Sequence, residues 1–164
     1  MGFGDYEVPD GIEPLIGYRG WIVRGGKLLS CYREIEWPIG GPLVSECLNP
    51  TFATLNQHPL GRHSSPDISC TCGVYALNEY PDIWEVREGE RRDTLKPWPY
   101  EAITGMVKSW GRIIIGDRGF RAQYAEPIAL VAKPQRGWWP KIIKDLAEAY
   151  GIEILDAKEV RRKL

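Results

Sequence analysis

The stretch YRGWIVRGGKLLSCYR, residues 18–33, decides the fold class. Two short runs rich in aromatic and branched side chains, residues 18–24 and 27–33, flank the dipeptide Gly25-Gly26. Two successive glycines can both adopt positive φ, which is what a two-residue β-hairpin loop requires. The stretch therefore predicts an antiparallel hairpin and a fold based on a sheet.

Further segments with the character of strands follow along the chain. Glycine and proline separate them, as is typical of short strands joined by turns. Within the longest segment, Gly105 and Gly111 are expected to mark bulges or bends, and Pro127 is expected to divide the last two strands. The predicted strands after the hairpin are residues 73–80, 102–115, 120–125 and 128–133.

The C-terminal part of the sequence has helical periodicity instead. Apolar residues recur at i, i+3 and i+4 spacing from Trp139 to Tyr150, Pro140 suits the first helical turn, and Gly151 suits the end. Asp156 is placed to cap a second, short helix. Together the patterns predict a mainly β member of the α+β class: a small antiparallel barrel or curled sheet with a C-terminal amphipathic helix.

The length and composition bound the organisation of the chain. Its 164 residues predict one domain, 1–164, with an irregular N-terminal arm at 1–17 and a helical segment at 138–164. A net charge of -1 lacks the basic excess common in nucleic-acid-binding domains. Neither a signal peptide nor a long apolar run is visible, so we expect a cytoplasmic protein with no membrane partner.

Residues 37–69 are rich in Pro, Gly, Ser and Asn, and an irregular loop of this length needs something to hold it. Five potential zinc ligands fall in or beside it: Cys47, His58, His63, Cys70 and Cys72. Structural zinc prefers four tetrahedral Cys and His ligands. We therefore predict a structural zinc bound by Cys47, His63, Cys70 and Cys72, with His58 as the substitute for His63.

Other interpretations of this loop stay open. Cysteines also occur as small buried apolar residues, with loop histidines simply at the surface. A disulfide or redox pair is a second alternative, although cytosolic thiols are normally kept reduced. A cysteine and a histidine could also form a nucleophile and base pair. The C-x-C spacing of Cys70 and Cys72 is tighter than that of typical zinc knuckles.

A second group of residues suggests a ligand-binding surface. Trp110, Arg112, Arg118 and Arg121 surround one predicted turn, and arginine offers a planar set of donors to a phosphate or a base. The alternative is that the aromatic side chain packs in the sheet and the arginines are solvated or paired with nearby acids.

Two sequence patterns carry a resemblance. They are the stretch CTCGVYA at residues 70–76 and Trp110-Gly111-Arg112 followed by GFRAQYA at residues 119–125. With them the chain resembles a group of small bacterial and phage proteins of unknown function that share C-x-C-G-[IV]-Y-A and W-G...G-[YF]-R-A patterns. The resemblance spans roughly residues 18 to 127, and it implies a single intact domain without indicating an activity.

Catalytic signatures are absent from the sequence. It contains no H-E-x-x-H, no deaminase H-x-E with P-C-x-x-C, no G-x-S-x-G, no Walker A loop and no Rossmann fingerprint. We therefore assign no catalytic residue and expect no small-molecule cofactor. The sequence favours a non-enzymatic binding or adaptor module whose partner is a protein or a nucleic acid. The alternatives are an enzyme with a Cys/His or metal-centred site at residues 47–72, and a nucleic-acid-binding β-barrel.

Overall fold

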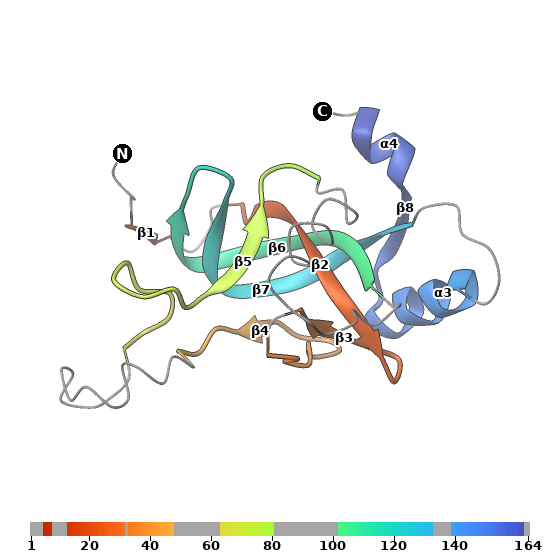
Figure 1. The fold of residues 1–164 in the computed structure, drawn as a ribbon, viewed down its shortest axis with the longest axis horizontal. Helices are drawn as coiled ribbons and strands as arrows, with labels where there is room; N and C mark the ends of the chain where they lie inside the picture. Colours follow the sequence, from red (N-terminus) through yellow and green to blue (C-terminus); the bar gives the residue numbers. More distant parts are fainter. Residues whose placement is uncertain are drawn as a thin grey trace, which may run out of the picture.

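The structure is a computed structural model that describes residues 5–7, 13–31, 33–47, 63–80, 102–132 and 139–162. Figure 1 shows its elements in space. In chain order they are β1 (Asp5–Glu7), β2 (Leu15–Arg24), β3 (Lys27–Ser30), β4 (Leu43–Val44), β5 (Val74–Leu77), β6 (Ala102–Ile115), β7 (Gly119–Ala132), α3 (Trp139–Tyr150), β8 (Glu153–Asp156) and α4 (Ala157–Arg162).

The predicted hairpin is present as β2 and β3, which pair antiparallel. Gly25 and Gly26 have φ angles of +59° and +73°, so the two-residue loop has the conformation whose twist matches the flanking strands. β3 ends at Ser30, short of the predicted end at Arg33. The reason is local, because Arg33 and Glu34 take positive φ angles of 64° and 48° and turn the chain.

β6 and β7 form the long central pair, and each strand has 14 residues. The register between them shifts after Met106 and after Trp110. Gly111, at φ +78°, lies in the second shift, as the sequence predicts. Pro127 lies opposite Val107 beside the first shift, and β7 continues through it. The prediction that Pro127 divides two strands is therefore wrong, because an irregular register tolerates a residue without an N–H donor.

Strand pairing curls the sheet into a partly closed barrel (Figure 1). β2 pairs with β6, β6 with β7, and β7 with β5, all antiparallel. β5 then returns to β2 through one pair, Tyr18 opposite Leu77. The circuit β2–β6–β7–β5–β2 confirms the predicted fold class. β8 adds a parallel strand beside the end of β7.

The side chain of Arg19 bridges the short seam between β2 and β5. Its guanidinium donates a hydrogen bond to the carbonyl oxygen of Tyr75 in β5 and another, at 3.2 Å, to Ser30 Oγ in β3. It also lies 5.1 Å from the ring centroid of Trp37. Burial lowers the pKa of Arg19 to about 10. A side chain thus joins the two strands where their backbone ladder is short.

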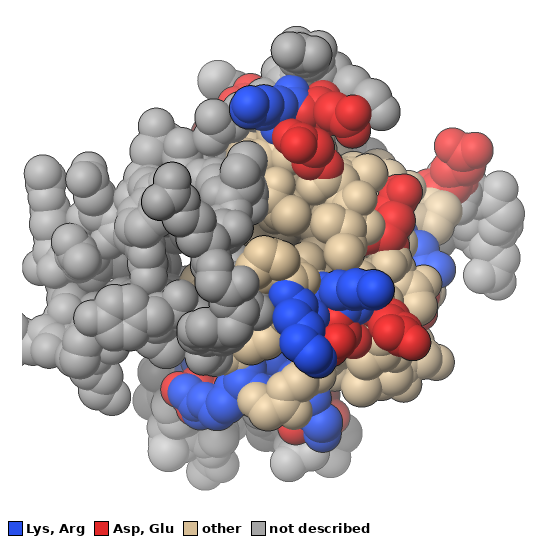
Figure 2. Space-filling view, turned by 90° about the vertical axis from the view of Figure 1, so that its right-hand side faces the viewer, with Lys and Arg blue, Asp and Glu red and all other residues tan. Residues whose placement is uncertain are grey.

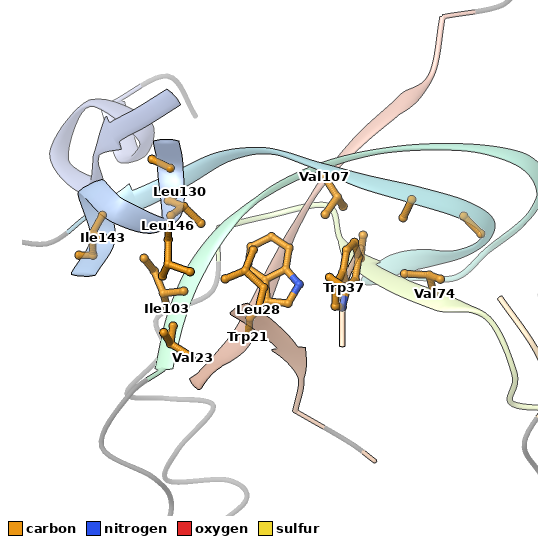
Figure 3. Close-up of a cluster of buried hydrophobic side chains, with 14 of the residues drawn as sticks. Trp21, Val23, Leu28, Trp37, Val74, Ile103, Val107, Leu130, Ile143 and Leu146 are labelled. Carbon is orange, nitrogen blue, oxygen red and sulfur yellow. The ribbon is translucent and has the colours of Figure 1, made fainter. Parts of the chain in front are cut away.

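The hydrophobic core lies inside the curled sheet and extends to α3 at one end (Figure 3). Trp21 and Trp37 are completely buried and meet edge to face, with ring centroids 5.4 Å apart. α3 buries Ile143, Leu146 and Ala147, on the face predicted from the periodicity. Each large side chain that is fully buried in this way contributes about 1.5–3 kcal/mol.

The last residue of α3, Tyr150, fixes the helix to the sheet. Its hydroxyl accepts a hydrogen bond from the backbone N–H of Leu28 at 3.0 Å and donates one to the carbonyl oxygen of Trp37 at 2.9 Å. Gly151, at φ +64°, ends the helix as predicted. The carboxylate of Asp156 accepts a hydrogen bond of 2.7 Å from the first turn of α4, which confirms the predicted cap.

The N-terminal residues correct a prediction. Residues 1–17 are expected to be an irregular arm, yet this range contains β1 and the first residues of β2. β1 pairs with the far end of β6, where Tyr6 lies opposite Ile113. A partner this distant in sequence leaves no local pattern from which the strand could be predicted.

Candidate metal centre

Four of the potential ligands meet at one point beside β7. The ligand atoms of Cys47, His63, Cys70 and Cys72, three thiol sulfurs and one imidazole nitrogen, all lie within 4.8 Å of one another. These are the four residues predicted as zinc ligands. The described part of the chain therefore contains a Cys/His cluster with dimensions that suit a metal ion.

The pairing of two short strands explains how the ligands meet. β4 and β5 both pair antiparallel with β7, on the edge that β6 leaves free. β4 lies opposite residues 124–125, and β5 begins opposite Ala122. The chain leaving β4 therefore runs toward the start of β5, which brings Cys47 to the segment that carries Cys70 and Cys72.

Within the cluster the ligand atoms form two close pairs. Cys47 Sγ lies 3.7 Å from Cys70 Sγ, and His63 Nε2 lies 3.3 Å from Cys72 Sγ. Cys70 is buried, and the other three side chains are partly buried. None of the four cysteines forms a disulfide, and Cys31 lies apart on the hairpin, with its thiol 3.4 Å from a carbonyl oxygen of β2.

Polar contacts shape the loop that carries the ligands. One carboxylate oxygen of Asp67 accepts hydrogen bonds from the backbone N–H of Ser69 at 2.9 Å and from its hydroxyl at 2.5 Å, an Asx turn just before Cys70. The hydroxyls of Ser45 and Ser65 also hydrogen bond and join the two arms of the loop. Bonding from Ser69 is the main reason why the pKa of Asp67 is lowered.

Burial of the Cys72 side chain favours the neutral form of its thiol in the absence of a cation. Burial raises the pKa of the Cys72 thiol to about 11, against the opposing effect of a hydrogen bond with Ser65. A bound divalent cation acts in the opposite direction, because it deprotonates a coordinating thiol.

Of the four residues of the suggested ligand surface, Arg112 and Arg121 both lie near the cysteine loop. Trp110 stacks on Tyr124, with centroids 5.8 Å apart and planes 24° apart. Arg118 is exposed in the turn between β6 and β7. Arg121 lies against the cysteine loop and donates hydrogen bonds to its carbonyl oxygens. Arg112 is close enough to Asp67 in the same loop to lower its pKa.

Sequence reasoning overlooked two residues of this region. Tyr75 donates a hydrogen bond of 2.7 Å from its hydroxyl to the carbonyl oxygen of Thr71. No sequence signal marks this role, because an exposed tyrosine in a strand such as β5 is common on the surface of a sheet. Asp67 forms the turn before Cys70, and the Asp-x-Ser pattern is a signal that could have found it. His58, the predicted substitute for His63, lies outside the described residues.

Comparison of the chain with known protein families, curated proteins and solved structures found no match. Among the described residues, no helix is both long enough and apolar enough to span a membrane.

Proposed function

We propose that Cys47, His63, Cys70 and Cys72 bind one structural zinc ion that holds the loop of a non-enzymatic binding module. The observation that carries the proposal is the convergence of four ligand atoms within 4.8 Å. Tetrahedral zinc with bonds of about 2.3 Å to sulfur and about 2.05 Å to nitrogen separates two sulfurs by about 3.8 Å and a sulfur from a nitrogen by about 3.6 Å. The separations of 3.7 and 3.3 Å lie within about 0.3 Å of these values.

The donor set supports zinc over a hard cation. Calcium and magnesium prefer oxygen ligands, whereas thiolate and imidazole select zinc among the common divalent ions. Four protein ligands also complete the tetrahedron and leave no open position for a substrate, which is the arrangement of a structural site. None of the four cysteines forms a disulfide, so the three cysteines of the cluster can serve as thiolate ligands.

A protein partner is favoured by exposed apolar side chains close to the ligands in the sequence. Three large apolar side chains are about half exposed and lie within three positions of a ligand: Val44, Ile68 and Tyr75. Exposed apolar surface is common at protein interaction sites. A zinc ion that fixes the loop would keep these side chains in place before binding, which lowers the entropy lost on association.

Nucleic-acid binding is a second candidate, carried by the stack of Trp110 on Tyr124. Lys108 Nζ lies 5.8 Å from the Trp110 ring centroid, but it also forms an ion pair of 2.8 Å with Glu126. On the face shown in Figure 2, the described basic and acidic side chains are intermixed. This candidate predicts binding that weakens steeply as salt concentration rises.

Elemental analysis and thermal melting test the proposed function. We expect one zinc per chain after purification, and we expect a chelator to lower the melting temperature, because metal binding stabilises the folded state.

A thiol reagent should modify Cys31 before the three ligand cysteines. Fast reaction of Cys72 in the zinc-loaded protein would favour the enzyme alternative, in which Cys72 and His63 form a nucleophile and base pair. Absence of metal together with an unchanged melting temperature would overturn the proposal.

A further inference from the structure

Three consecutive carbonyl oxygens in the Cys-x-Cys segment are held by two side chains. Arg121 Nη1 donates to the carbonyl oxygens of Cys70 and Cys72, each at 2.6 Å. Between these two, the carbonyl oxygen of Thr71 accepts the hydroxyl proton of Tyr75 at 2.7 Å. The same Arg121 nitrogen lies 3.4 Å from the carbonyl oxygen of Asp67. The backbone that carries two of the four ligands is thus fixed from the barrel side.

The barrel explains why these two side chains reach the loop together. Tyr75 in β5 and Arg121 in β7 are directly opposite in the strand pairing. The guanidinium carbon of Arg121 lies 5.8 Å from the centroid of the Tyr75 ring. Gly73, at φ +127°, allows the loop to pass this close, because a Cβ there would lie 2.8 Å from Arg121 Cβ. The CTCGVYA and GFRAQYA patterns therefore meet in one structural unit.

We infer that Arg121 and Tyr75 are positioning residues of the metal centre, an inference that rests on the proposed zinc site. Fixing the carbonyls of residues 70–72 fixes the peptide planes on both sides of Thr71. This restricts the directions in which the Cys70 and Cys72 side chains leave the backbone. Groups that orient metal ligands in this manner raise metal affinity, because less conformational freedom is lost when the ion binds.

The charge of Arg121 acts in the same direction as its hydrogen bonds. Three thiolates and one neutral imidazole around Zn²⁺ carry a net charge of about -1. Arg121 brings a positive charge to the carbonyls of two ligand residues, and it is partly buried, so solvent screens it less than a surface charge. Lysine keeps this charge but lacks the planar guanidinium, so Arg121→Lys separates charge from geometry.

Zinc affinity measured by competition with a chromophoric chelator tests the inference. Arg121→Met should raise the zinc Kd by about 10–100-fold, the range typical for loss of a residue that orients a ligand. The zinc Kd of Arg121→Lys should lie between the Kd of Arg121→Met and that of the wild type. Tyr75→Phe removes a single hydrogen bond from a half-exposed side chain and should raise the Kd by about 5-fold. The matched control Arg118→Met, at an exposed arginine in the turn, should leave the Kd within about 2-fold of the wild type.

Cobalt substitution provides a readout that general destabilisation would not change. The visible absorption of Co²⁺ bound to the cysteines depends on the coordination geometry, so folded Arg121→Met and Tyr75→Phe proteins should show altered bands, and Arg118→Met should not. If Arg121→Met does not fold, Tyr75→Phe alone tests the positioning role. If the folded variants bind zinc as tightly as the wild type and show an unchanged cobalt spectrum, the positioning role is overturned but the proposed zinc site is not. Failure of the wild type to bind zinc would overturn both.

Discussion

Cys47 Sγ and Cys70 Sγ lie 3.7 Å apart although 23 positions separate the two residues in the sequence. Neither residue lies in a regular element, and their approach follows from the pairing of β4 and β5 with one edge of β7. These two thiols, with a third thiol and an imidazole within 4.8 Å, form a cluster that could hold a metal ion.

Replacing one ligand should remove most of the stabilisation by metal. Cys47→Ser is expected to raise the zinc Kd by more than about 100-fold and to reduce the effect of a chelator on the melting temperature. At free zinc 1,000-fold above the wild-type Kd, a 100-fold rise in Kd would remove about 2.7 of the about 4.1 kcal/mol that zinc contributes. Cys31→Ser is the matched control, because Cys31 lies outside the cluster. Equal zinc content in the two variants would argue against Cys47 as a ligand.

The choice of histidine can be tested separately. His63 Nε2 is in the cluster, at 3.3 Å from Cys72 Sγ, so His63→Ala should lose tight zinc binding. His58→Ala should keep wild-type affinity in the same chelator competition. The reverse result would show that His58 is the ligand and that the described position of His63 is not the one used by the metal.

The hydroxyl of Tyr150 should make stability depend on alkaline pH. Burial is the main reason why the pKa of Tyr150 is raised above its ordinary value of 10.0. A folded-state pKa above the unfolded value means that the contribution to stability is fully present below pH 10 and is lost as the pH rises through the folded pKa.

Tyr150→Phe measures this contribution. The variant leaves the Leu28 N–H and the Trp37 carbonyl without this partner and should destabilise the protein by about 1–3 kcal/mol at neutral pH. Its unfolding free energy, determined with denaturant at pH 8 and pH 11, should fall less between the two values than that of the wild type. Parallel pH profiles for the two proteins would mean that Tyr150 is not the titrating group.

The pairing of β6 with β7 leaves no room for a side chain at Gly105. A Cβ at this position would lie 2.2 Å from the carbonyl oxygen of Ala129 and 2.7 Å from the Trp21 ring, so the central strand pair would have to move. Gly105→Ala should reduce the unfolding free energy by about 3 kcal/mol. Gly41→Ala is the control, because no atom lies within 4 Å of a Cβ there, and its effect should be below about 1 kcal/mol. Comparable losses in both variants would contradict the close approach.

The hairpin and α3 could be predicted because short-range sequence patterns determine them. The glycine pair at Gly25-Gly26 predicted the hairpin, and helical periodicity predicted α3 with its end at Gly151. The four members of the Cys/His cluster were predicted from residue type and from their crowding in one loop, although buried apolar cysteines and a disulfide were open alternatives. The strands that place these ligands, β4 and β5, were only partly predicted because β4 has two residues.

Long-range pairing accounts for what the sequence did not reveal. β1 is three residues long and is stabilised by the far end of β6, so no periodicity marks it. Pro127 suggested a break between two strands. The strand continues because Pro127 lies beside the register shift near Val107, which the sequence does not reveal. Arg121 was predicted only as a candidate ligand-binding residue. Its hydrogen bonds to carbonyl oxygens of the cysteine loop could not be predicted, because they depend on the β5–β7 register.

X-ray absorption at the zinc edge of the purified wild-type protein tests the central claim most directly. The proposed centre predicts one zinc per chain with three sulfur neighbours at about 2.3 Å and one nitrogen neighbour at about 2.0–2.1 Å. A protein without zinc, or zinc surrounded only by nitrogen and oxygen, would contradict the assignment of Cys47, His63, Cys70 and Cys72 as its ligands.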